Sequence, residues 1–319
     1  MIYLIGTFPS VIATGMNPFI NAQGYATTGM ISVVIGAIAN IVLDPLFIFM
    51  LNLGIRGAAI ATVLSQCLSA GFVLYFLSKK AEYKVRLLYK EEIRTCGKDA
   101  KNIVSLGTAG FVMQLTNSLV SICCNNVLSA TGGDVYVSVM TIISSVRQMI
   151  ETPIWSISEG SSPVISYNYG AKRPKKVIEA WITMSVLALI YSLIAWSVIL
   201  FAPKFLIGIF SSDKSLMIDT VPAMKLYFSA FIFMLFQYTG QTMFKSLNKK
   251  KQAIFFSILR KVIIVVPMTY MFPYVFHMGS NGVFMAEPVS NVIGGSLCFI
   301  VMLLTVLPEL KQMNSDLSS

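Results

Sequence analysis

The chain has 319 residues, of which 55% are hydrophobic and 12% are charged, and its mean hydropathy is +0.74. A soluble domain carries roughly 25% charged residues, so this composition excludes an ordinary soluble enzyme and indicates an all-α polytopic membrane protein. The formal net charge of +10 could suggest a nucleic-acid partner. The distribution of that charge along the chain favours a lipid bilayer instead.

Nine apolar stretches are long enough to cross a bilayer, which takes about 20 residues each. In chain order they lie near 3–20, 28–50, 57–78, 103–130, 136–160, 180–202, 220–244, 253–274 and 283–307. The first stretch contains Pro9 and Asn17 and lacks the basic leader of a signal peptide. We therefore expect nine transmembrane helices, the first of them included.

An internal repeat relates some of these apolar stretches to one another. Shifted by 225 residues, 8–65 aligns with 233–290 without a gap. The identical pairs include Gly15/Gly240, Phe47/Phe272, Gly54/Gly279, Gly57/Gly282 and Ala61/Ala286. Transporters are commonly built from such repeats. Because residues of about 100–205 have no counterpart before Met1, we expect half of one repeat followed by a whole second one.

Basic residues alternate between the predicted loops. Seventeen Lys and Arg lie in 79–102, 171–176, 245–251 and the C-terminal tail, whereas the alternate loops hold only Arg56, Lys204 and Lys214. This is the positive-inside pattern, which predicts a cytoplasmic C-terminus. The predicted domains are a partial N-lobe of three helices (1–78), a basic cytoplasmic loop (79–102), a complete C-lobe of six helices (103–308) and a cytoplasmic tail (309–319).

Residues with catalytic or metal-binding spacing are not evident. None of the five cysteines has the spacing of a metal site, and there is no paired nucleophile and base and no phosphate-binding loop. The single histidine, His277, falls in a short outer loop, where we expect it to be solvated. The sequence predicts no enzyme, no metal and no cofactor.

Ionisable residues inside the bilayer are costly and usually functional. Asn40 and Asp44 share one helix face at i and i+4, and Pro45 next to them tends to kink the helix. Across the following outer hairpin, Thr62 lies at a similar depth. These oxygen-bearing side chains could bind a hard cation, or Asp44 could carry a proton. The alternative is that Asp44 only forms hydrogen bonds between helices.

The repeat relates this arrangement to a second one. Asp44 corresponds to Thr269 and Thr62 to Glu287, so each outer hairpin carries one acid and one threonine, on opposite helices. We hypothesise that Glu287 is a second titratable or substrate-facing site. A structural carboxylate bonded to a neighbouring helix is the alternative.

Other intramembrane charges have simpler interpretations. Arg147 and Glu151, at i and i+4, are expected to form a buried structural ion pair. Glu159 and Arg260 lie nearer the cytoplasmic ends of their helices, where snorkelling toward the interface accounts for them.

Three segments carry a family resemblance. The sequences GAIANIVLDPLFIF (36–49) and GIRGAAIAT (54–62) resemble the fifth and sixth helices of MATE multidrug and toxin extrusion transporters. The sequence PVISYNYGA (163–171) resembles the family's signature after its eighth helix. The resemblance covers nearly the whole chain and is closest to the MepA-like bacterial branch. It implies that the nine helices correspond to helices 4–12 of a two-lobe fold, so that the first three are lacking.

The resemblance implies a monomeric antiporter of the bacterial plasma membrane, which exports cationic amphipathic drugs in exchange for Na⁺ or H⁺. Asn40, Asp44 and Thr62 match positions of the family's N-lobe cation site. The first-helix aspartate that often completes that site is absent. Where some members carry an acid in the seventh helix this chain has Gln114, and the tenth helix offers Gln237 and Gln241, which are candidates for a substrate cleft.

Two alternatives to efflux remain from the sequence. A flippase for lipid-linked sugars, from the same superfamily, should have a large basic cavity for phosphates, whereas the intramembrane bases here are few, namely Arg147, Arg260 and Lys261. The other alternative is a truncated, non-transporting fragment whose first lobe is incomplete.

Overall fold

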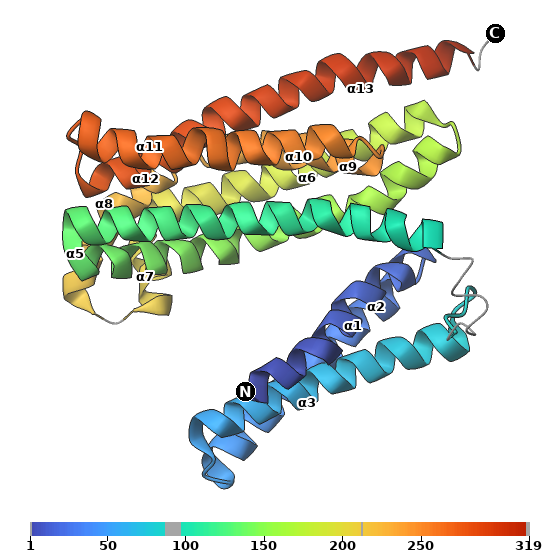
Figure 1. Cartoon of the computed structure of the whole chain (residues 1–319), viewed down its shortest axis with the longest axis horizontal. Coiled ribbons are helices and arrows are strands. Elements are labelled where there is room, and N and C mark those ends of the chain that lie inside the picture. Colours follow the sequence, from blue (N-terminus) through green and yellow to red (C-terminus); the bar gives the residue numbers. More distant parts are fainter. Residues whose placement is uncertain (1, 87–96, 212, 317–319) are drawn as a thin grey trace. The chain divides into compact units, whose positions relative to one another are not determined.

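The computed structural model describes residues 2–86, 97–211 and 213–316 (Figure 1). Every regular element in these ranges is helical, which confirms the predicted all-α class. The chain divides into two compact units, Met1–Gly97 and Lys98–Ser319. Residues 87–96 of the predicted basic loop and 317–319 of the predicted tail lie outside the described residues.

Three helical rods form the first unit. They are α1 (Ile2–Ala22), α2 (Ala26–Pro45) continued by the π-helix η1 (Leu46–Met50), and α3 (Gly54–Tyr75) continued by η2 (Phe76–Lys80). Polar side chains connect them, because Asn17 on α1 donates to Ser32 Oγ on α2 at 2.7 Å, and Ser69 on α3 donates to the Ser32 carbonyl at 2.9 Å. Hydrogen bonds of this kind join helices where the surrounding lipid gives little hydrophobic driving force.

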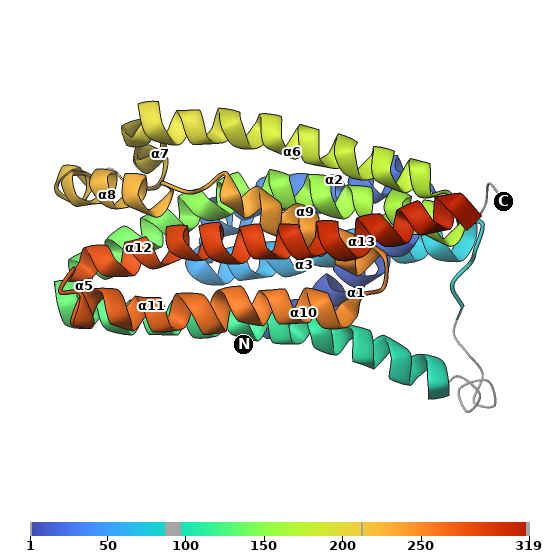
Figure 2. The ribbon, with the colours of Figure 1, turned by 90° about the horizontal axis from the view of Figure 1, so that it is seen from above.

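The second unit is a larger helical bundle, whose long helices run alongside one another (Figures 1 and 2). Its elements are α5 (Gly97–Gly170), α6 (Pro174–Phe201), α7 (Pro203–Phe210), α8 (Lys214–Tyr227), α9 (Phe233–Ser246), α10 (Lys250–Ile258), η3 (Leu259–Val265), α11 (Val266–Tyr270), η4 (Met271–Val275), α12 (Ser280–Ser290), η5 (Asn291–Gly295) and α13 (Ser296–Asp316). Gly133, at φ 70° and ψ −170°, breaks α5 into two helices. Glycine tolerates that conformation because it has no Cβ.

Six helices in the described ranges are long and apolar enough to cross a membrane. They are Ala26–Met50, Gly54–Lys80, Gln114–Gly170, Pro174–Phe201, Lys250–Val275 and Ser280–Ser315. The third of these has 57 residues and contains Gly133, so it covers the segment predicted at 136–160 and residues 114–130 of the segment predicted at 103–130. The predicted segment at 3–20 is helix α1, and the short helix α7 was not predicted.

The segment predicted as one helix at 220–244 is instead two helices, α8 and α9, separated by turns at 228–232. Backbone groups freed by this break need other partners. Trp196 Nε1 on α6 donates to the Phe228 carbonyl at 2.9 Å, and the Phe231 amide donates to the same carbonyl at 3.1 Å. A tertiary hydrogen bond therefore supports an interruption that contains neither glycine nor proline.

Backbone geometry confirms the internal repeat. Asn52 and His277, 225 residues apart, have φ of 51° and 52°, and Gly54 and Gly279 have φ of 52° and 55°. The π-helices η1 and η4 are related by the same shift. The two hairpins therefore share one turn geometry, in which His277 is exposed, as expected from the sequence.

Close helix packing in both hairpins depends on glycine. A Cβ on Gly57 would lie 2.6 Å from the Phe47 carbonyl oxygen, and one on Gly282 would lie 2.7 Å from the Pro273 nitrogen. Real Cβ atoms are not found that close to backbone. Each repeat thus uses the same small residue to bring its two helices together, as helix interfaces in membranes commonly do.

In the second unit, two apolar clusters lie on either side of a layer of polar residues, which we call the polar level. On α9, Leu235 belongs to a cluster with residues of α5, α6, α8 and α12, whereas Met243 belongs to a cluster with residues of α6, α10 and α13. Gln237 and Gln241 lie on α9 between these two positions and are themselves buried. The apolar packing therefore holds the helices on both sides of a polar layer.

Candidate functional site

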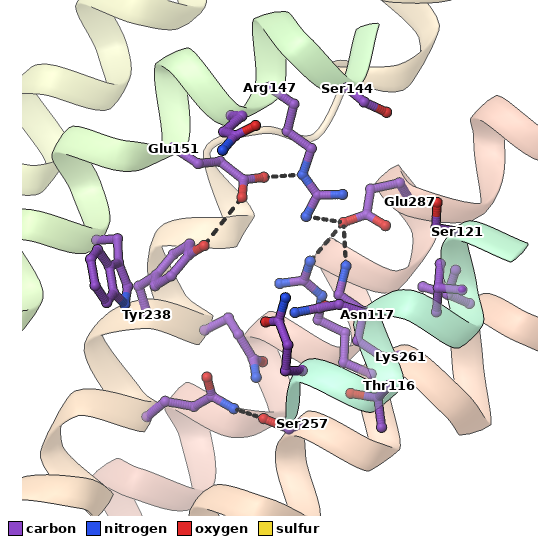
Figure 3. A pocket seen from close by; sticks show the side chains of 18 of the residues that line it. Thr116, Asn117, Ser121, Ser144, Arg147, Glu151, Tyr238, Ser257, Lys261 and Glu287 are labelled. Carbon is purple, nitrogen blue, oxygen red and sulfur yellow. Dashed lines mark hydrogen bonds and ion pairs between the residues drawn. The ribbon is translucent and has the colours of Figure 1, made fainter. Parts of the chain in front are cut away.

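A cavity of about 710 Å³ opens at this polar level of the second unit. Its wall is made by residues of α5, α8, α9, α10, η3 and α12 up to Glu287 (Figure 3). The volume falls within the range of small-molecule sites, about 300–1,000 Å³. The charged residues of the wall are Arg147, Glu151, Glu159, Lys245, Arg260, Lys261 and Glu287.

Glu287 lies at the centre of the charges in this wall. Its Oε1 accepts from Arg260 Nη2 at 2.6 Å, lies 3.1 Å from Arg147 Nη2, and accepts from Lys261 Nζ at 3.3 Å (Figure 3). The side chain is 6% exposed. A carboxylate so far from water would be costly without partners of opposite charge, and three cations supply them here.

Arg147 and Glu151 pair with each other in the structure, their side chains are partly buried, and their contacts extend to further residues. Arg147 Nε donates to Glu151 Oε1 and Nη1 donates to the Tyr227 hydroxyl at 2.6 Å, while the Tyr238 hydroxyl donates to Glu151 Oε2 at 3.2 Å. Since Arg147 also reaches Glu287, the pair is one end of a connected charged cluster. We define this charged cluster as Arg147, Glu151, Arg260, Lys261 and Glu287.

The interfacial position expected for Arg260 is wrong. Arg260 is 5% exposed and bonded to Glu287. Its stem packs against Gly294 of η5, where a Cβ would lie 3.0 Å from Arg260 Cγ. Arg260 and Lys261 are neighbours in η3, and the wider turn of a π-helix lets adjacent side chains point toward one side, a feature frequent at functional sites. Packing against Gly294, rather than distance from the helix end, therefore sets the environment of Arg260.

All three glutamines predicted for a substrate cleft line the cavity, although they come from two different helices. Gln241 donates to Ser257 Oγ at 2.6 Å (Figure 3), whereas Gln237 Oε1 is buried without a hydrogen-bond partner. Gln114 on α5 is exposed. An unsatisfied amide oxygen in a cavity wall offers an acceptor to a ligand.

The structure does not bring Glu287 and Thr269 into one site. Thr269 is fully buried, donates to the Val265 carbonyl at 2.8 Å and lies 3.8 Å from Cys124 Sγ. It is not one of the residues found in the cavity wall. The acid of the second hairpin therefore faces the cavity, while its threonine belongs to the packing between helices.

In the first unit, Asn40 and Asp44 lie on α2 and Thr62 lies on α3, which packs against α2. All three side chains are partly buried. Asn40 Nδ2 and Asp44 Oδ1 are buried atoms without a hydrogen-bond partner, and Thr62 donates to the Ala58 carbonyl at 2.9 Å. Buried polar atoms are rarely left unpaired, so Asp44 has capacity for a further ligand.

Sequence reasoning missed the convergence of Arg260 and Lys261 on Glu287, and also the contacts of Tyr227 with Arg147 and of Tyr238 with Glu151. The available signal was the pair of adjacent bases inside an apolar stretch. Within the ranges that the structure describes, no group of three or more His, Cys, Asp or Glu residues could hold a metal ion.

The geometry defines a polytopic membrane protein with a polar, charged cavity enclosed by helices, and comparisons with known proteins agree with that class. The MatE family model matches residues 110–271. The chain is 26% identical to the multidrug export protein MepA of Staphylococcus aureus over 296 residues, which cover 91% of this chain and 62% of that protein. It is 25% identical to MepA of Staphylococcus saprophyticus over 297 residues, with the same coverage.

Solved structures resemble the fold closely. A MOP superfamily transporter from Pyrococcus furiosus superposes with a TM-score of 0.88 at 24% identity, over 98% of this chain and 69% of that one. A MATE structure in the bent conformation gives a TM-score of 0.84 at 23% identity, over all of this chain and 69% of that one.

This chain belongs to the MatE family, in its MepA-like branch. It spans 62% of the length of the MepA proteins named above. The family consists of ion-coupled transporters, which are not enzymes and need no cofactor. With its apolar helices, this membership makes the chain an integral protein of the bacterial plasma membrane.

Proposed function

We propose that the protein carrying this chain is a multidrug efflux antiporter, which exports cationic amphipathic compounds in exchange for Na⁺ or H⁺. The observation that carries the proposal is the cavity of about 710 Å³ in the second unit, lined by tyrosine and glutamine side chains and by charged groups. Its size and mixed polarity suit small amphipathic molecules. The MepA relatives are multidrug export proteins.

The two units take different tasks in this proposal. Asp44, with Asn40 and Thr62, binds the coupling ion, and the cavity of the second unit contributes to the substrate path. Asp44 suits this task because its Oδ1 is buried without a partner. We also propose that the protein works as a monomer with its C-terminus in the cytoplasm, the side that its basic loops favour.

Transport follows from thermodynamic linkage between the two sites. If the coupling ion and the substrate favour different states of the protein, an inward ion gradient drives release of substrate on the outside. Each ligand shifts the equilibrium only by its difference in affinity for the two states. Rocking of one repeat of the intact protein against the other would then alternate access to the substrate site.

Asp44→Asn tests the proposal. We expect it to abolish gradient-driven efflux of ethidium from cells or vesicles that contain the intact protein, because the neutral amide loses the charge that attracts a cation. Efflux is measured as the fall in ethidium fluorescence after a Na⁺ or H⁺ gradient is imposed, and membrane insertion is checked by immunoblot.

The matched control is Asp134→Asn, which makes the same chemical change at an exposed position. This variant should transport at the wild-type rate. Efflux by Asp44→Asn at the rate of the control would contradict the role given to Asp44, and no efflux by the wild-type protein under either gradient would contradict antiport.

A further inference from the structure

The charges in the cavity wall do not balance. Four Lys or Arg side chains and three Glu side chains line it. Lys245 and Glu159 pair with each other at 3.1 Å, which leaves the charged cluster with three cations and two carboxylates. The described part of the wall contains no other acid. One positive charge in this cluster therefore has no carboxylate of its own.

Within the described wall, Arg260 and Lys261 pair with Glu287 alone, whereas Arg147 also pairs with Glu151. Arg260 and Lys261 both reach a single oxygen, Glu287 Oε1, which Arg147 approaches as well. Arg260 is only 5% exposed, and its Nε has no hydrogen-bond partner. A guanidinium offers five N–H donors, so Arg260 retains a donor that an additional acceptor could satisfy.

We propose that this corner of the cavity, formed by Arg260 and Lys261 beside Glu287, binds the acidic group of an organic ligand, such as a carboxylate or the phosphate of a lipid headgroup. Arginine and lysine together are the usual partners of such groups. The inference rests on the proposed function and refines its substrate class: the compounds bound best carry an acidic group in addition to their cationic and aromatic parts.

The cavity supplies contacts for the rest of such a ligand. Tyr238 and Trp155 line the same wall, and Figure 3 shows Tyr238 on the Glu151 side, with Lys261 on the Glu287 side. Aromatic faces attract organic cations. A zwitterionic amphipathic compound can therefore place its acid at Lys261 and its cationic ring system near the tyrosine.

Two dyes of almost equal size test the charge preference. Rhodamine B carries a carboxylate on a cationic ring system, whereas its methyl ester lacks the negative charge. Binding to purified protein in phosphatidylcholine nanodiscs is followed by fluorescence anisotropy. We expect rhodamine B to bind about tenfold more tightly than the ester, equivalent to about 1.4 kcal/mol. Equal affinities, or tighter binding of the ester, would overturn the proposal.

Lys261→Met locates the preference. It should reduce the ratio of the two affinities to near one by weakening rhodamine B, while Lys261→Arg should retain it. Lys204→Met removes the same charge at an exposed site on α7 and should leave both affinities unchanged. If Lys261→Met does not yield a monodisperse protein, the comparison of the two dyes on the wild-type protein still tests the charge preference. A preference that persists in a folded Lys261→Met would overturn the assignment to this corner.

Acidic lipid distinguishes the two sources of the acidic group. Unchanged rhodamine B affinity in phosphatidylglycerol nanodiscs identifies a soluble compound as the ligand, whereas competitive loss of affinity identifies a lipid phosphate. The outcome is separate from that of the Asp44 experiment. If the protein prefers rhodamine B but shows no gradient-driven efflux, the binding site stands and antiport is rejected. If it shows efflux but no preference between the dyes, antiport stands and the binding site is rejected.

Discussion

At the scale of single residues, Glu287 links the cavity to the stability of its bundle. Removing one member of a buried ion pair usually costs more than the pair contributes, because the remaining charge keeps its desolvation penalty. Here one carboxylate faces three cations. Its loss would leave three positive charges together in a poorly solvated wall, where only Glu151 could still offset them.

Glu287→Gln should therefore destabilise the second unit, by about 3–5 kcal/mol if it behaves as other broken buried pairs do. The measurement is the melting temperature of the purified protein in detergent. Glu179→Gln is the matched control, because Glu179 pairs with Lys176 at 3.4 Å with both side chains mostly exposed, and exposed pairs contribute about 0–1 kcal/mol.

Adding Lys261→Met to Glu287→Gln should recover part of the stability, since it removes one of the cations left behind. If the Glu287→Gln protein is as stable as the Glu179→Gln protein, the Glu287 carboxylate is not needed to stabilise the three buried cations. Unchanged transport rate and pH dependence in a folded Glu287→Gln protein would remove Glu287 from the proposed transport site.

The sequence identifies several residues of the cavity wall but not the contacts that they make with one another. Glu287, Arg147 and the glutamines stand out because polar groups in apolar stretches are rare. Arg260 was misplaced because distance from a helix end does not report which side of a π-helix a residue faces. That information depends on packing against Gly294, a long-range contact that no local pattern records.

At the scale of elements, the duplicated hairpins show where local sequence does determine structure. Gly54 and Gly279 adopt positive φ, and Gly57 and Gly282 permit close approach of helices, so a 225-residue shift of the sequence predicted a match that the backbone confirms. The break at 228–232 was not predictable in this way. It depends on Trp196 of another helix, and its own residues include no helix breaker.

Two glycines of α3 should respond differently to alanine. Gly57→Ala places a methyl group 2.6 Å from the Phe47 carbonyl oxygen, and overpacking of this kind costs about 1–3 kcal/mol. Gly71 has no atom within 4 Å of its Cβ position, so Gly71→Ala should leave stability unchanged or raise it by up to about 1 kcal/mol. Thermal unfolding of the two variants in detergent provides the comparison. Similar melting temperatures would mean that the hairpin can open without cost.

At the scale of the whole molecule, the charge distribution predicts an orientation that can be measured. In a variant whose native cysteines are replaced, His277→Cys should react with a membrane-impermeant maleimide on intact cells, because the positive-inside rule places its loop outside. Lys172→Cys should react only after the cells are permeabilised. Both residues are exposed turn positions with positive φ, so they are matched in accessibility. The reverse labelling pattern would invert the predicted topology.

The two hairpins also bear on how such a molecule can change over time. Their turns are alike, yet one carries its acid before the turn, at Asp44, and the other after it, at Glu287. The backbone of the hairpin therefore has the same turn geometry whichever of its two helices carries the acid. A lineage that inherits this duplicated template can move an acid from one arm to the other by point substitutions while the backbone of both hairpins persists.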